Sequence, residues 1–160
     1  MSNAVFNPPV AINEPILSYA PGTPEREELQ KTVAAFRAQQ MDIPMFINGK
    51  EIRTGNAVTM HPPYDHKHKL GQFHMGDASH VNDAIEAALA ARQAWADLPW
   101  EQRASVFLKA AELAAGPYRQ KLNAATMLAQ SKNAFQAEID AACEYIDFLR
   151  FNVEFMRRIY

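Results

Sequence analysis

The sequence predicts a predominantly α-helical fold with a small β-hairpin region. Over most of residues 77–160, apolar residues recur every three or four positions, which is the period of an amphipathic helix. Residues 41–76 instead contain Asn48-Gly49, the pair that favours a two-residue hairpin turn. Residues 1–22 hold four prolines, each of which fixes φ and removes a backbone donor. We therefore expect an extended arm (1–22), a helix (23–40), a hairpin and strand region (41–76) and a helical region (77–160).

The first helix has a clear start. Thr23 is a good N-cap residue, Pro24 suits the first helical position, and the acidic residues that follow complement the helix dipole. The apolar residues then recur at helical spacing, at Leu29, Val33 and Phe36.

The hairpin region contains four candidate strands. Residues 43–47 and 50–53 flank the Asn-Gly turn, and residues 58–60 and 69–73 supply two further short apolar runs. Residues 61–66 are rich in proline and polar side chains, so we expect a loop there.

The C-terminal half predicts four more helices. Ser79 is a candidate cap for the first, Pro99 begins the second, and Gly116-Pro117 separates the second from the third. The last helix runs from about Ala134 to Tyr160 with apolar residues over much of its circumference, so it requires packing partners on several sides. No cap, glycine or proline ends this helix. These features predict the opening segment of a larger protein whose sheet would cover the apolar faces.

Composition excludes several classes of protein. The formal net charge is −2 and the sixteen basic residues form no run, which argues against a nucleic-acid partner. No apolar stretch approaches the roughly 20 residues of a membrane helix, and no secretory signal is present. The single cysteine fits a reducing compartment, so we expect a cytoplasmic protein, with the mitochondrial matrix as the alternative. The sequence has no glycine-rich phosphate-binding loop.

Two groups of residues are candidates for a metal site or a nucleophile, and neither has the pattern that such a site requires. Four histidines crowd residues 61–74, but only Asp65 and Asp77 accompany them as carboxylate donors, so we interpret them as polar loop residues and expect no metal site. Cys143 lies on the apolar stripe of the last helix near several acidic residues, which raise a thiol pKa. We therefore expect a packed core cysteine and not a nucleophile.

Glu144 is the most distinctive carboxylate. Asp140, Glu144 and Asp147 share one ridge of the last helix by their spacing, and a solvated face is the simplest interpretation. Glu144, however, has Phe148 and Phe151 beside it. A carboxylate between aromatic rings on a largely buried helix is costly unless a cation meets it. Either an arginine or a substrate ammonium group could be that cation.

The sequence resembles the N-terminal part of aldehyde dehydrogenases, in the branch that acts on 1-pyrroline-5-carboxylate. The resemblance covers the chain from about residue 12. It is carried by residues 13–17, 22–26, 85–92 and 103–111, and above all by Gln136 to Asn152 (QAEIDAACEYIDFLRFN). One departure is Ser131-Lys132, where many members have Gly-Lys.

The resemblance implies the N-terminal portion of the α/β aldehyde dehydrogenase fold. It also implies NAD-dependent oxidation of L-glutamate γ-semialdehyde to L-glutamate, in proline catabolism. The family's catalytic and cofactor-binding residues would then all lie downstream of Tyr160, and Cys143 does not match the nucleophile. Of the family's functional positions, only a substrate-binding acidic residue falls inside this chain, at Glu144.

The expected partners follow from the same resemblance. They are the remainder of the enzyme chain, a small-molecule aldehyde substrate and further copies in a homo-oligomer. The 160-residue chain alone is expected to be inactive. The alternative interpretation is a stand-alone helical binding or regulatory module derived from a truncated dehydrogenase.

Overall fold

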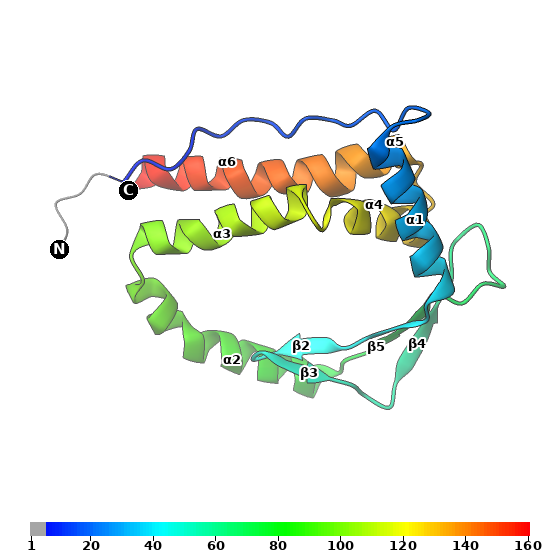
Figure 1. Ribbon diagram of the computed structural model, residues 1–160. Coiled ribbons are helices and arrows are strands. Elements are labelled where there is room, and N and C mark those ends of the chain that lie inside the picture. The colour runs from blue at the N-terminus through cyan, green and yellow to red at the C-terminus, as the bar shows by residue number, and fades with distance from the viewer. Residues whose placement is uncertain (1–5) are drawn as a thin grey trace.

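The computed structural model describes residues 6–160. Residues 1–5 of the expected arm lie outside the described residues. From residue 6 the arm runs along the last helix, and a second long helix lies against that helix from below (Figure 1). The remaining helices and two small sheets continue away from this pair and curve back beneath it (Figure 1). The observed fold is mostly helical with little sheet, which confirms the predicted fold class.

The first helix, α1, spans Pro24–Ala38 and lies beside α4, which spans Arg119–Gln130. Thr23 occupies the N-cap position, but its hydroxyl donates to the carbonyl of Ala20 instead of accepting from the helix. A small core between α1, α4 and the arm forms from three buried residues and the partly buried residues around them. The buried residues are Tyr19, Leu29 and Ala124.

The predicted hairpin is confirmed. Strands β2 (Met45–Ile47) and β3 (Lys50–Ile52) pair antiparallel, with Ile47 opposite Lys50. Asn48 and Gly49 both have positive φ, at 52° and 71°, as a type I′ turn requires.

The expectation of one strand over residues 43–47 is wrong, because Pro44 interrupts it. Strand β1 (Met41–Ile43) pairs in parallel with β5 (Gly71–His74), which also pairs antiparallel with β4 (Ala57–Met60). A proline has no N–H to donate to a ladder, so the chain leaves one sheet and enters the other at this residue.

Two long helices follow, α2 (Ala78–Asp97) and α3 (Trp100–Ala115), and Pro99 separates them as expected. The predicted cap of α2 is wrong by two residues. Asp77 is the N-cap, and its carboxylate accepts from the backbone N–H groups of Ser79 and His80. Ser79 instead lies inside the first turn, where its hydroxyl donates to the Asp77 carboxylate.

The last helix differs from the prediction in its middle. It begins as α5 (Ala134–Ala137), widens into the π-helical segment η1 (Glu138–Cys143) and continues as α6 (Glu144–Ile159). Small buried side chains let α3 approach this helix closely. The core between them consists of Ala111, Ala114, Ala142 and Ile146.

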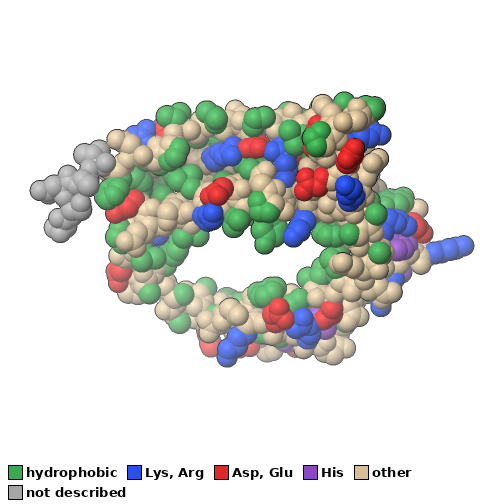
Figure 2. Space-filling model, in the orientation of Figure 1, with side chains coloured by type: hydrophobic (Ala, Val, Ile, Leu, Met, Phe, Trp, Pro, Cys, Tyr) green, Lys and Arg blue, Asp and Glu red, His purple; other side chains and the backbone are tan. Residues whose placement is uncertain are grey.

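A large apolar surface remains exposed. Helix α2 has no buried residue, and Val81, Ile85 and Leu89 are each more than half exposed. Figure 2 shows an opening through the molecule, with hydrophobic side chains gathered on its rim. Among residues 6–160, no helix combines the length and apolar composition needed to cross a membrane.

Candidate functional site

Glu144 is the first residue of α6, and its position agrees with the solvated face expected as the simplest interpretation. Its side chain is exposed and not buried. It borders an open groove of about 470 Å³ whose other lining residues are Asn13, Asp147, Phe148, Phe151, Asn152 and Phe155. The aromatic neighbours expected from the sequence are therefore present, but the carboxylate keeps access to solvent.

The three acids expected on one ridge have different surroundings. Asp140 lies inside η1 and pairs with Lys132 at 2.6 Å. Asp147 accepts hydrogen bonds of 2.7 Å from the Asn13 side chain and from the backbone N–H of Glu14, so it binds the arm. Within residues 6–160, Glu144 has no ion-pair partner. Glu144 thus lines the groove without such a pair.

The arm, α4 and the last helix share a buried charge cluster, which the sequence interpretation did not find. Arg119 of α4 pairs with Glu138 of η1 and with Glu14 of the arm. Glu14 also pairs with Arg150 of α6 at 2.7 Å. The cluster contains two cations and two anions, so its formal charge is balanced. Removing one member would leave an uncompensated buried charge.

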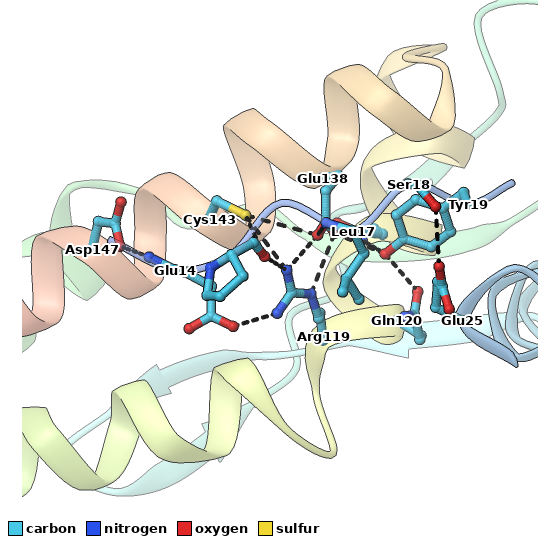
Figure 3. Close-up of polar contacts among 12 residues, drawn as sticks. Glu14, Leu17, Ser18, Tyr19, Glu25, Arg119, Gln120, Glu138, Cys143 and Asp147 are labelled. Carbon is cyan, nitrogen blue, oxygen red and sulfur yellow. Dashed lines mark hydrogen bonds and ion pairs between the residues drawn. The ribbon is translucent and has the colours of Figure 1, made fainter. Parts of the chain in front are cut away.

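Glu138 is the most deeply buried member of the cluster, with no solvent exposure. Its carboxylate accepts hydrogen bonds from the Leu17 backbone N–H at 2.9 Å, the Tyr19 hydroxyl at 2.7 Å and the Asn123 amide at 2.8 Å. Arg119 supplies further donors, so charged and neutral groups together satisfy both oxygens (Figure 3).

The pKa values follow from this environment. Burial favours the neutral form of Glu138, but the Arg119 guanidinium and the surrounding donors outweigh it and hold the pKa below its usual range. Burial and the adjacent Glu138 carboxylate raise the pKa of Tyr19 to about 12. The tyrosine hydroxyl is thus a proton donor throughout the neutral range.

A signal for Glu138 is present in the sequence in retrospect. Glu138, Ala142 and Ile146 are spaced at i, i+4 and i+8, and the latter two are core residues. A carboxylate on the buried row of a helix requires a cation from elsewhere in the chain. The identity of that cation, Arg119, has no comparable sequence signal.

Cys143 is buried as expected, at 5% exposure. Burial raises the pKa of its thiol to about 11, and the Glu138 carboxylate adds to this effect. The neighbouring acids expected to matter were Asp140, Glu144 and Asp147, whereas the largest charge effect comes from Glu138. Such a thiol holds very little thiolate at neutral pH, so it is a poor nucleophile.

The histidines of residues 61–74 occupy separate positions. His61 contacts the His68 carbonyl, His66 is exposed, and His74 is buried with Nε2 2.9 Å from Asp42. Within the described residues, no three His, Cys, Asp or Glu side chains come together as a metal site would require. His74 instead connects β5 to β1 through Asp42 and to the loop at Thr54.

The groove has features suited to binding a cation. Glu144, which forms no ion pair with the residues that the structure describes, lies beside phenylalanine rings, a combination that attracts organic cations through charge and through the ring faces. The buried cluster offers no free nucleophile, because its acids and its thiol are engaged with one another.

Comparison with known proteins shows the family to which the chain belongs. The sequence profile of the aldehyde dehydrogenase family matches residues 50–160. The chain belongs to the aldehyde dehydrogenase family.

Within this family, two relatives of the same name illustrate the similarity. Over 158 residues the chain is 49% identical to delta-1-pyrroline-5-carboxylate dehydrogenase of Agaricus bisporus, covering 98% of this chain and 29% of that protein. It is 44% identical over 143 residues to the mitochondrial delta-1-pyrroline-5-carboxylate dehydrogenase of Homo sapiens, covering 89% of this chain and 25% of that protein. These relatives confirm the branch that the sequence resembles.

Solved structures agree with this similarity in sequence. A crystal structure of the Delta-pyrroline-5-carboxylate dehydrogenase from Mycobacterium tuberculosis, bound with NAD and cobalamin, superposes with a TM-score of 0.96 at 44% identity. The superposition covers 99% of this chain and 30% of that one. The chain thus spans less than a third of the length of these relatives, and its fold is that of the matching part of an aldehyde dehydrogenase.

Proposed function

We propose that this chain forms the N-terminal part of an NAD-dependent dehydrogenase. The proposed reaction oxidises L-glutamate γ-semialdehyde, the open-chain form of 1-pyrroline-5-carboxylate, to L-glutamate. The observation that carries the proposal is the similarity over 98% of this chain to a dehydrogenase of that name. The nucleophilic cysteine, the general base and the NAD-binding residues would come from the rest of the enzyme.

This proposal gives each region of the chain a role in the complete enzyme. Residues 1–22 would be an arm over the helices, residues 23–40 a helix, residues 41–76 the strand region, and residues 77–160 the helices flanking a nucleotide-binding sheet. The exposed apolar face of α2 supports this division, because a sheet from the rest of the enzyme would bury it. The complete enzyme would be a soluble homo-oligomer in the cytoplasm or mitochondrial matrix.

Within this enzyme, Glu144 would bind the substrate. Glutamate semialdehyde carries an α-ammonium group, and the Glu144 carboxylate lies in a groove with Phe148 and Phe151 but without an ion-pair partner among the described residues. A carboxylate beside aromatic rings complements an ammonium group by charge and by cation–π attraction. The chain has no glycine-rich phosphate-binding loop, so the NAD contacts would come from the rest of the enzyme.

The test uses an enzyme in which residues 1–160 replace the corresponding part of the M. tuberculosis relative, called below the fused dehydrogenase. NADH formation from the semialdehyde is measured for the fused dehydrogenase and for the 160-residue chain alone. Activity of the former with none from the latter supports the proposal. A well-folded fused dehydrogenase that forms no NADH would reject it in favour of a stand-alone binding module.

Glu144 is then tested by Glu144→Ala in the fused dehydrogenase. We expect the KM for the semialdehyde to rise about tenfold, the effect of losing one charged contact, with the KM for NAD unchanged. Asp140→Ala is the matched control, because Asp140 is an exposed acid on the same helix that pairs with Lys132. Equal effects of the two variants, or equal changes in both KM values, would eliminate the substrate role of Glu144.

A further inference from the structure

The backbone of Glu144 closes the π-helical turn. Its N–H donates to the carbonyl of Ile139, five residues earlier, whereas an α-helix joins residues four apart. The extra residue rotates everything after the turn by roughly 100° relative to a continuous α-helix. The turn therefore sets which face of the helix carries Glu144.

Arg119 contacts both ends of this turn. Its guanidinium pairs with Glu138, the first residue of η1, and Nη2 lies 3.6 Å from the sulfur of Cys143, the last residue. The Cys143 sulfur is also 3.8 Å from a carboxylate oxygen of Glu138 (Figure 3). One buried side chain from α4 thus holds together the two ends of a segment that departs from α-helical geometry.

The arm contacts the same turn and the arginine that holds it. The Pro15 carbonyl accepts from Arg119 Nη2 at 2.6 Å, and the Leu17 N–H donates to Glu138. Glu14 continues the contact toward α6 through its pairs with Arg119 and Arg150. A π-helical turn is less favourable than an α-helical one and persists where surrounding contacts fix it.

We propose that Arg119 and Glu138 are positioning residues for Glu144, because they fix the π-helical turn that directs Glu144 into the aromatic groove. The proposal rests on the proposed role of Glu144 in substrate binding. Neither residue lines the groove, so neither would touch the substrate. They act on substrate affinity through the direction in which the helix presents Glu144.

The test is Arg119→Lys in the fused dehydrogenase, alone and combined with Glu144→Ala. A lysine keeps the charge, but its single ammonium nitrogen cannot span Glu138, Glu14 and Pro15 as the three nitrogens of the planar guanidinium do. We expect Arg119→Lys to raise the KM for the semialdehyde about tenfold, while kcat and the KM for NAD stay within about twofold. In the Glu144→Ala background it should add less than about twofold, because the residue it acts through is absent.

Arg150→Lys is the matched control. Arg150 shares the partner Glu14 but contacts neither Glu138 nor Cys143, so its effect on the semialdehyde KM should be small. Three results would overturn the proposal: additive effects of Arg119→Lys and Glu144→Ala, an equal effect of Arg150→Lys, or a uniform fall in kcat and both affinities. The last of these would mean that Arg119 only stabilises the fold.

Tyr19→Phe is a milder second variant in case Arg119→Lys does not fold, since it removes one donor to Glu138 and keeps both charges.

Amide hydrogen exchange of Glu144 separates the substrate role of Glu144 from the control of the turn by Arg119 and Glu138. If Glu144→Ala leaves the KM unchanged, the substrate role fails by itself. Faster exchange of the Glu144 N–H in Arg119→Lys and Tyr19→Phe would still support control of the turn by the cluster, and unchanged exchange would refute it.

Discussion

The hydroxyl of Tyr19 donates a 2.7 Å hydrogen bond to the carboxylate of Glu138, 119 residues further along the chain. The same hydroxyl accepts from the Asn123 amide at 2.8 Å. Tyr19 lies in the arm and has a positive φ of 52°, so the chain adopts a backbone conformation unusual for tyrosine at this contact. The contact joins the arm, α4 and the π-helical segment at one buried point.

Replacing Tyr19 by Phe should destabilise the chain by about 1–3 kcal/mol, the cost of leaving buried polar partners short of a hydrogen bond. The ring packing against Leu29 and Ala124 would be retained, so the loss of stability measures the contribution of the hydroxyl. Urea unfolding of the 160-residue chain, followed by circular dichroism, measures the difference. A matched control is Tyr118→Phe, because Tyr118 is half exposed. Equal stability of the Tyr19 and Tyr118 variants would show that the buried contact contributes nothing.

Stability should decrease at alkaline pH. The pKa of Cys143 is raised to about 11 from 9.0 and that of Tyr19 to about 12 from 10.0, mainly by burial. Folding therefore favours the protonated form of each group. Their contribution is complete below the unfolded-state pKa values and is lost as pH rises through the folded-state values. Unfolding free energies should thus fall between about pH 9 and pH 12.

The double variant Tyr19→Phe with Cys143→Ala controls for the other groups that titrate in this range. Its stability should depend less on pH than that of the parent chain, measured by urea unfolding at matched ionic strength. Parallel curves for the two proteins would mean that neither buried group is responsible for the alkaline loss.

Cys143 should resist thiol reagents. A shift in its pKa from 9.0 to about 11 reduces the thiolate fraction at pH 8 about 100-fold, and burial reduces access further. Reaction with a chromogenic disulfide should therefore be at least about 100-fold slower in the native chain than in the urea-unfolded chain. Reaction at the unfolded rate under native conditions would contradict the buried position.

The local patterns of the sequence predicted the helices and the hairpin, because these depend on spacing within a few residues. The Asn48-Gly49 turn and the Pro99 boundary are examples, and the structure has both. Pro44 was equally visible, but its consequence depended on β5, some 30 residues later, which takes β1 into a different sheet.

The candidate site was only partly accessible to such reasoning. The proximity of Glu144 to Phe148 and Phe151 was predicted, since the three lie within two turns of one helix. The π-helical turn was not, because Glu138 to Cys143 has no residue that opposes an α-helix, and the turn depends on Arg119 from another helix. The Tyr19–Glu138 contact likewise joins segments that no local pattern relates.

The turn after α4 gives the last prediction. Ser131 ends this helix in the left-handed conformation, with φ 59° and ψ 23°, and its side chain is exposed. A residue with a Cβ loses roughly 1–2 kcal/mol in this conformation, whereas glycine does not. Glycine also makes the unfolded chain more flexible, which offsets about 0.4–1 kcal/mol of the gain.

Ser131→Gly should therefore stabilise the chain by about 0.5–1 kcal/mol, measured as a higher urea midpoint at unchanged slope. Ser131→Ala separates backbone strain from side-chain effects, because alanine also has a Cβ and no hydroxyl. It should leave the midpoint nearly unchanged. Higher stability in both variants would attribute the effect to loss of the hydroxyl. Lower stability in Ser131→Gly would mean that unfolded-state flexibility outweighs the strain that the left-handed serine imposes on this turn.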